Sequence, residues 1–126
     1  METYDLTITK TIKVTEEDID DIMSTALEGG INYWCDKAEV FGQRLGDYAS
    51  EQIARGGTLK LHDAEDNRNH LLTRNGLLKG IKQAIEGNYF ACYNWFDGNA
   101  IDTCMVDAEV ADVIIQFALF DDIVYG

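Results

Sequence analysis

The chain has 126 residues, and its 23 acidic and 10 basic residues give it a formal net charge of −13. This length matches one domain of common size, and a hydrophobic fraction of 46% is too high for a disordered protein. A surface with this much negative charge repels phosphate backbones and anionic lipids. We therefore expect no direct binding to nucleic acid or to a membrane.

Cysteine usage and the N-terminal residues indicate the compartment. Cys35, Cys92 and Cys104 are far apart and show no CxxC spacing, which fits small buried thiols in a reducing environment. The first residues carry acid early, unlike a signal peptide, and no apolar run approaches the roughly 20 residues that span a bilayer. We therefore expect a cytoplasmic protein.

The N-terminal quarter predicts a strand followed by a helix. Tyr4, Leu6 and Ile8 alternate with polar residues, which predicts a strand over residues 3–14. Thr15 and the acids after it resemble a capping box, and the apolar residues that follow recur at helical spacing. We expect this helix to stop at residues 29–30, because glycine takes the left-handed cap conformation without steric cost.

The middle of the chain predicts an extended segment over residues 31–41, a short helix over 47–55 and a hairpin. The hairpin strands are 58–63 and 69–73, joined by the polar turn AEDNR. A turn centred on Asp66 would place His62 opposite His70 across the strands.

The C-terminal half predicts two more helices. Residues 74–87 carry one apolar stripe, and Asp107 can cap a final helix with an apolar inward face. The aromatic run 88–99 fits a strand or a packed loop, and the chain ends in a docked tail. Together these elements predict a single α+β domain, with about three helices packed on a small antiparallel sheet.

Three stretches carry a resemblance to a known group of proteins. The strings ALEGGINYWCDKAEV, YASEQIARGGTLKLHDAE and ADVIIQFALFDDIVYG resemble a family of small acidic uncharacterised proteins of phages and integrated mobile elements of Gram-positive gut bacteria. The resemblance implies an accessory gene product acting in the bacterial host cytosol. Some such genes encode inhibitors of host defence systems. No site residue follows from it.

No catalytic or cofactor motif is visible. The chain lacks GxSxG, GxxxxGK[ST], GxGxxG and HExxH, so we expect no enzyme, no catalytic residue and no cofactor. His62 and His70 alone make a poor metal site, because stable zinc sites use three or four protein ligands. We predict no metal. The alternatives left open are a solvent-facing histidine pair and a shared metal with a third ligand from elsewhere.

Two features suggest binding surfaces. The stretch EEDIDD (16–21) fits the positive end of a helix, with its outer acids on the solvated side as a docking face for a basic protein. The aromatic segments 33–34 and 89–96 fit a core, a partner surface or a ligand pocket, and these readings stay open. The candidate protein-binding residues are Glu17, Asp20, Asp21, Tyr33, Trp34, Tyr93 and Trp95.

The leading hypothesis is a non-enzymatic acidic binding protein whose partner is a host protein with a basic surface. Its sharpest form is an inhibitor of a defence protein whose negative surface mimics nucleic acid. One alternative is an oligomeric binder of a small nucleotide-like ligand, with the aromatics stacking and a basic strip holding phosphate. Another is a self-associating structural protein. The strip consists of Arg68, Arg74, Lys79 and Lys82.

Overall fold

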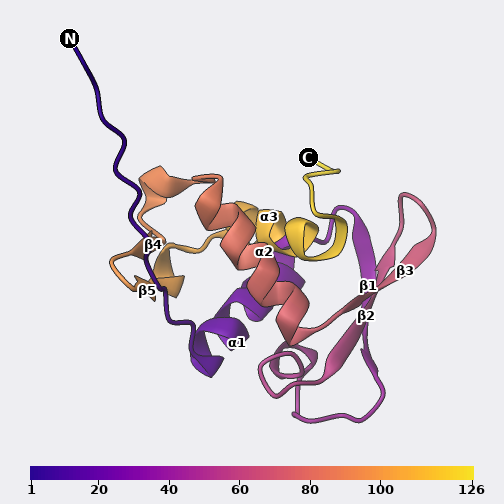
Figure 1. Ribbon diagram of the computed structural model, residues 1–126. Helices are drawn as coiled ribbons and strands as arrows, with labels where there is room; N and C mark the ends of the chain where they lie inside the picture. Colours follow the sequence, from indigo (N-terminus) through magenta and orange to yellow (C-terminus); the bar gives the residue numbers. More distant parts are fainter.

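A computed structural model describes all residues, 1–126, and has the predicted α+β class (Figure 1). Three helices and five strands are joined by short helical turns, among them Ala26–Gly30, Ala49–Glu51 and Ala91–Tyr93. The helices are α1 (Glu16–Thr25), α2 (Arg74–Glu86) and α3 (Ala108–Phe120), and the strands are β1 (Cys35–Phe41), β2 (Thr58–Asp63), β3 (Arg68–Leu72), β4 (Phe96–Asp97) and β5 (Ala100–Ile101).

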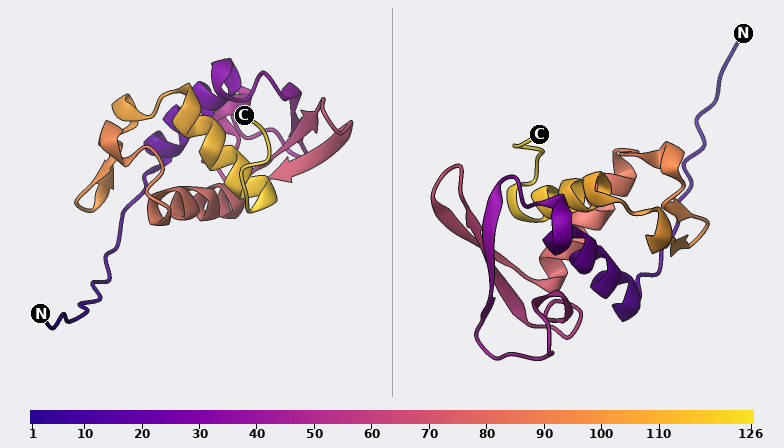
Figure 2. Two further views of the ribbon diagram at one scale, coloured as in Figure 1. Left: turned by 90° about the horizontal axis from the view of Figure 1, so that it is seen from above. Right: turned by 180° about the vertical axis from the view of Figure 1, so that it is seen from behind.

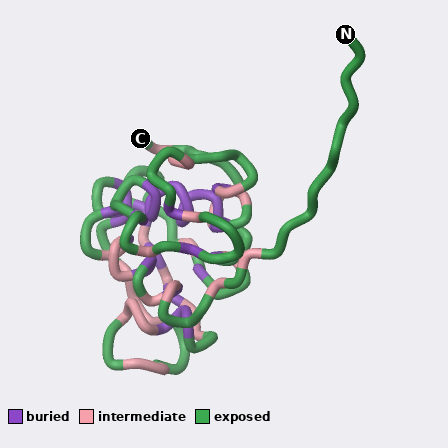
Figure 3. The backbone as a smooth tube through the Cα atoms, turned by 90° about the vertical axis from the view of Figure 1, so that its left-hand side faces the viewer, coloured by how far each residue is buried: buried purple, intermediate pink, exposed green.

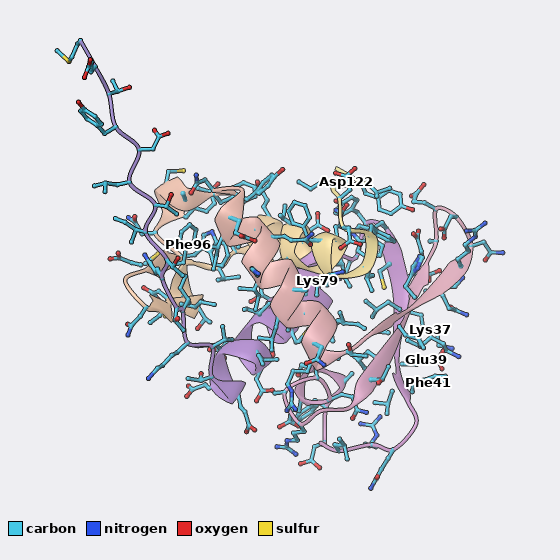
Figure 4. The ribbon with its side chains drawn as sticks, viewed as in Figure 1. Lys37, Glu39, Phe41, Lys79, Phe96 and Asp122 are labelled. Atoms are coloured by element: carbon cyan, nitrogen blue, oxygen red, sulfur yellow. The ribbon has the colours of Figure 1, made fainter.

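The helices cover one face of the larger sheet. This sheet is antiparallel in the order β1-β2-β3, and β4 and β5 form a separate small hairpin. Helices α2 and α3 lie against each other on one side of the sheet, and α1 lies beside them (Figures 1 and 2). Lys37, Glu39 and Phe41 of β1 point away from the helices (Figure 4). One cluster of 25 buried apolar residues fills the space between the layers.

The predicted start of α1 is confirmed. The Thr15 hydroxyl accepts a hydrogen bond from the Asp18 N–H, and the Asp18 carboxylate accepts one from the Thr15 N–H, both at 3.0 Å. The predicted reason for the stop at residues 29–30 is wrong, because neither glycine has a positive φ. Gly30 is instead buried, and a Cβ there would lie 2.8 Å from the Ala108 carbonyl oxygen. The glycine therefore lets the end of the helix approach α3 closely.

The predicted strand over residues 3–14 is wrong. The first twelve residues form no regular element, and Tyr4, Leu6 and Ile8 are 84%, 90% and 83% exposed. Figure 3 shows this segment leaving the body as an exposed arm. Only Lys13 makes a bridge, to Ala100 of β5. The alternating pattern is present, but a strand needs a partner for its backbone groups, and this chain offers the arm none.

The predicted hairpin is confirmed, but its predicted register is wrong by one residue. His62 pairs with Asn69 and Leu61 pairs with His70, across a turn in which Asn67 has φ 56°. A shift of one residue moves a side chain to the opposite face of the sheet. His62 therefore lies on the open face and His70 on the helix-covered face, so the two histidines cannot share a metal.

The remaining predictions hold in part. Of residues 31–41, β1 covers the last seven, and the short helix expected over 47–55 is a single turn, Ala49–Glu51. Both predicted later helices are confirmed, with Thr73 and Asp107 as their N-caps. The aromatic run is mostly turn, and β4 is its only strand.

Candidate functional site: an aromatic and acidic pocket

The candidate site is a cavity of about 460 Å³ beside the C-terminal tail. Helix α3, the turn before β1, the loop after α2 and the tail all contribute to it. Aromatic and acidic side chains dominate its wall, and neither lysine nor arginine is among its nine lining residues. The aromatic and acidic residues of the wall are Tyr33, Tyr89, Phe90, Glu109, Asp112 and Tyr125.

Asp112 anchors the wall of this pocket. It sits in the middle of α3 with 8% of its surface exposed. Its Oδ1 accepts hydrogen bonds from Trp34 Nε1 at 2.8 Å and Gln116 Nε2 at 3.0 Å, and its Oδ2 accepts one from the Tyr33 hydroxyl at 2.5 Å. All three donors are neutral, so they satisfy the carboxylate without cancelling its charge. The pocket therefore has a fixed negative charge in its wall.

Gln116 fastens the tail that closes the pocket. Its Oε1 accepts hydrogen bonds from the N–H groups of Val124 and Tyr125, and its Nε2 donates to the Tyr125 carbonyl oxygen. The Tyr125 ring also stacks on Trp34, with 5.5 Å between the ring centroids. These contacts confirm the predicted docked tail and hold Tyr125 at the edge of the cavity.

The loop after α2 supplies the opposite wall. Phe90 has φ 54° and ψ 30°, a left-handed conformation that is unusual for a bulky residue. Its ring stacks on Tyr93, and Tyr89 packs edge-on against Phe117. Backbone strain of this kind concentrates at functional sites. Phe90 is one of the residues that line the pocket.

The surroundings of Tyr33, which lines the pocket, and of Tyr93, which lies outside its lining, raise the pKa of both phenols. Burial, the hydrogen bond to Asp112 and the charge of Asp112 together raise the pKa of Tyr33 to about 12. Burial and the nearby charges of Glu109 and Asp107 raise the pKa of Tyr93. Both phenols stay neutral at physiological pH, and in the pocket Tyr33 can offer its π face while its hydroxyl is bonded to Asp112.

The structure separates the aromatic residues that the sequence grouped together. Tyr33 and Tyr93 are 52% and 38% exposed, whereas Trp34 and Trp95 are fully buried. The suggested binding roles of Trp34 and Trp95 are wrong, because their indole N–H groups donate to the Asp112 carboxylate and the Tyr89 carbonyl inside the molecule. Phe96, beside Trp95, is half-buried on the far side of α2 from the sheet (Figure 4).

The acids of α1 lie away from this pocket. In Figure 1 and the right panel of Figure 2, α1 and the C-terminal tail lie on opposite sides of the molecule. Glu17 is exposed, and Asp21 accepts a hydrogen bond from the Thr103 hydroxyl. Asp20 is partly buried, contrary to the predicted solvated side, and its pKa is raised by burial and by the charge of Glu51.

The predicted basic strip does not form one site. Arg74 donates to the Ala54 carbonyl oxygen, and Lys79 on α2 (Figure 4) makes an ion pair with Asp121 at 2.7 Å. Lys82 lines a separate groove between α2 and residues 10–14, and Arg68 lies at the start of β3. The aromatic pocket contains none of these cations, which weighs against a ligand that needs both.

The thiols divide between core and surface. Cys35 is buried, and burial raises the pKa of its thiol. Cys92 and Cys104 are exposed, so the expectation that all three are buried is wrong. The three thiols form no disulfide.

Sequence reasoning missed Glu109, Asp112 and Tyr125 as pocket residues, whereas Tyr89 and Phe90 belong to the segment 89–96, for which a ligand pocket is one of the open readings. A usable signal was present in α3, where Asp112 and Gln116 are polar residues four apart in an otherwise apolar run. That spacing places both on one face of a helix. A buried acid and a buried amide on one face indicate a polar network. They do not identify the groups that this network binds.

Comparison of the chain with protein families, with curated proteins and with solved structures finds no match. None of the helices has the length and apolar character needed to cross a bilayer.

Proposed function

We propose that this is a non-enzymatic binding protein that docks on a basic protein partner and takes a cationic side chain of that partner into the aromatic and acidic pocket. The pocket is the observation that carries the proposal. The rings of Tyr33, Tyr89 and Phe90 offer π faces, and the carboxylates of Glu109 and Asp112 supply negative charge. An arginine or lysine is attracted by both.

The overall charge supports the same class of partner. With a net charge of −13, the protein attracts a basic surface over a long range and raises the rate of encounter. The resemblance to phage and mobile-element proteins supplies a biological setting, in which the partner is a host defence protein whose basic surface normally meets nucleic acid. In that setting the protein acts in the host cytosol.

A hexa-arginine peptide is the direct probe of the pocket. We expect it to bind the full chain in isothermal titration calorimetry at low salt, with an affinity that falls as salt is added. Glu109→Gln should weaken binding several-fold. Glu17→Gln removes the same charge from α1, outside the pocket, and should have a smaller effect.

A second pair of variants tests the aromatic wall. Phe90→Ala should weaken peptide binding, whereas Phe41→Ala, which removes an exposed ring from the open face of the sheet, should leave it unchanged. If Glu17→Gln lowered the peptide affinity as much as Glu109→Gln, and Phe41→Ala changed it as much as Phe90→Ala, only the overall charge would attract the peptide. The proposed pocket would then be wrong.

A further inference from the structure

We propose that Asp63, Asp66 and His70 form a binding site for a transition-metal dication of the Zn²⁺ class at the end of the β2–β3 hairpin. Each residue offers one ligand atom, and these atoms all lie within 4.8 Å of one another. The three ligands lie outside the pocket described above, although Tyr125, which lines that pocket, donates a hydrogen bond to Asp63. It also differs from the expectation of no metal, which considered only a pairing of His62 with His70.

Two of the three distances between ligand atoms are close to those around a tetrahedral ion, and the third pair lies within 4.8 Å. His70 Nε2 lies 3.4 Å from Asp63 Oδ2 and 3.7 Å from Asp66 Oδ2. Two ligand atoms that are each about 2.1 Å from a zinc ion lie about 3.4 Å apart when they subtend a tetrahedral angle. His70 can therefore share an ion with either carboxylate near its present position, and three protein ligands leave one position for water.

The imidazole nitrogen of His70 lacks any other partner. Nε2 is inaccessible to solvent and makes no hydrogen bond, although it faces both carboxylates. The carboxylate oxygens of Asp63 and Asp66, at 3.4 Å and 3.7 Å, are its neighbours, and an ion held between the three groups would give the buried nitrogen a partner of good geometry. His62 provides the contrast, because its two ring nitrogens contact oxygens of Asp36 and Asn67.

The carboxylate of Asp63 is already held in place. The side chain is fully buried, its Oδ1 accepts hydrogen bonds from the N–H groups of Glu65 and Asp66, and its Oδ2 accepts one from the Tyr125 hydroxyl at 2.6 Å. Partners of this kind orient metal-binding carboxylates in known sites. The ring of Phe120 packs edge-on against His70, with 4.9 Å between centroids, and fixes the imidazole plane.

The ligand set determines which ions should bind. Carboxylates alone favour Mg²⁺ or Ca²⁺, whereas an imidazole favours ions such as Zn²⁺. We therefore expect Zn²⁺ to bind more tightly than either. Because Tyr125 contacts Asp63, bound metal would also tie the hairpin to the C-terminal tail.

The test is calorimetric titration of the metal-free full chain with zinc chloride. The exposed thiols of Cys92 and Cys104 are first replaced by serine, because thiolates also bind zinc. We expect one Zn²⁺ per chain, with Mg²⁺ and Ca²⁺ binding at least about tenfold more weakly. His70→Ala and Asp66→Asn should each lower the zinc affinity at least about tenfold.

His62→Ala is the matched control, since it removes the other histidine of this hairpin, which contacts the carboxylate of Asp36 on β1 and faces the opposite side of the sheet. It should leave zinc binding unchanged. Circular dichroism identifies any variant that fails to fold. In the chain that carries only the two serine replacements, the NMR signals of the His70 ring should shift when zinc is added. Three results would overturn the proposal: His70 ring signals that do not shift, a loss of zinc affinity in His62→Ala as large as in His70→Ala, or an affinity for Mg²⁺ equal to that for Zn²⁺. The cluster would then be an ordinary ion pair between the imidazole and the carboxylates.

Discussion

Asp112 shows how one residue shapes the candidate site. A buried carboxylate loses favourable hydration, and here three neutral donors replace the lost water contacts without a cation. Removal of the carboxylate would leave the Trp34 N–H, the Tyr33 hydroxyl and the Gln116 amide short of an acceptor. The cost of retaining the charge is explained if that charge serves the pocket, as the proposed function requires.

The Tyr33 phenol gives a prediction at this scale. Its pKa is raised to about 12 in the folded protein, against about 10 in an unfolded chain. A raised pKa adds stability that is fully present below pH 10 and disappears as the pH rises from about 10 to 12. Urea unfolding across this range should show a loss of stability that is smaller in Tyr33→Phe. Tyr48→Phe, at a residue 73% exposed, is the control, and an equal effect of both variants would contradict the assignment to Tyr33.

Tyr33 and Trp34 also mark the limit of what sequence can predict for single residues. Both are large and amphipathic, and they are neighbours in a turn, where no periodicity assigns one to the core. Both donate to Asp112, which lies 78 positions further along the chain from Trp34, and Trp34 is in addition covered by the rings of Phe120 and Tyr125. Burial in a turn is decided by such distant contacts, and a local pattern does not contain them.

At the scale of elements, the pairing of α2 and α3 depends on a glycine. Gly80 is buried where the helices cross, and a Cβ there would overlap the Ile114 carbonyl oxygen and lie 2.9 Å from the Ala118 nitrogen. The absent side chain lets the two backbones approach. Glycine destabilises a helix by about 1 kcal/mol relative to alanine. At Gly80 the close packing of the two helices offsets this local cost.

Gly80→Ala should therefore destabilise the protein. Overpacking of a core costs about 1–3 kcal/mol, and the backbone groups involved cannot move aside as a flexible side chain could, so we expect a net loss of about 2 kcal/mol in chemical unfolding. Gly76→Ala, in the same helix, is the matched control, because its Cβ would come no closer than 3.4 Å to another group. That variant should be neutral or slightly more stable. A similar loss in both would show that close packing at Gly80 is not the cause.

The elements predicted correctly carry their signals within their own residues. Thr15, Thr73 and Asp107 each cap a helix through a bond to a backbone N–H three residues later. The failures concern pairing, which local signals do not determine. The N-terminal arm has a strand pattern without a partner, and the hairpin register depends on a turn geometry that places Asn67 at a positive φ. The fold class was therefore predictable, whereas the pocket, made by four separate segments, was not.

At the scale of the whole molecule, the net charge of −13 acts on stability and on binding in opposite ways. Like charges repel most strongly in the compact state, so the charge destabilises the fold. The same charge attracts a basic partner. Exposed ion pairs such as Lys37 with Glu39 contribute little to offset the repulsion, because each is weak in water.

Added salt should therefore stabilise the protein while it weakens peptide binding. Between about 0.01 M and 0.15 M salt the screening length falls from about 30 Å to about 8 Å, which is enough to suppress repulsion across the molecule. We expect the thermal midpoint to rise over this range in the presence of EDTA, and the affinity for hexa-arginine to fall. Potassium chloride in place of sodium chloride separates screening from specific ion binding and should give the same result. A midpoint that falls with salt would mean that surface ion pairs outweigh the net repulsion, and the argument from overall charge would be wrong.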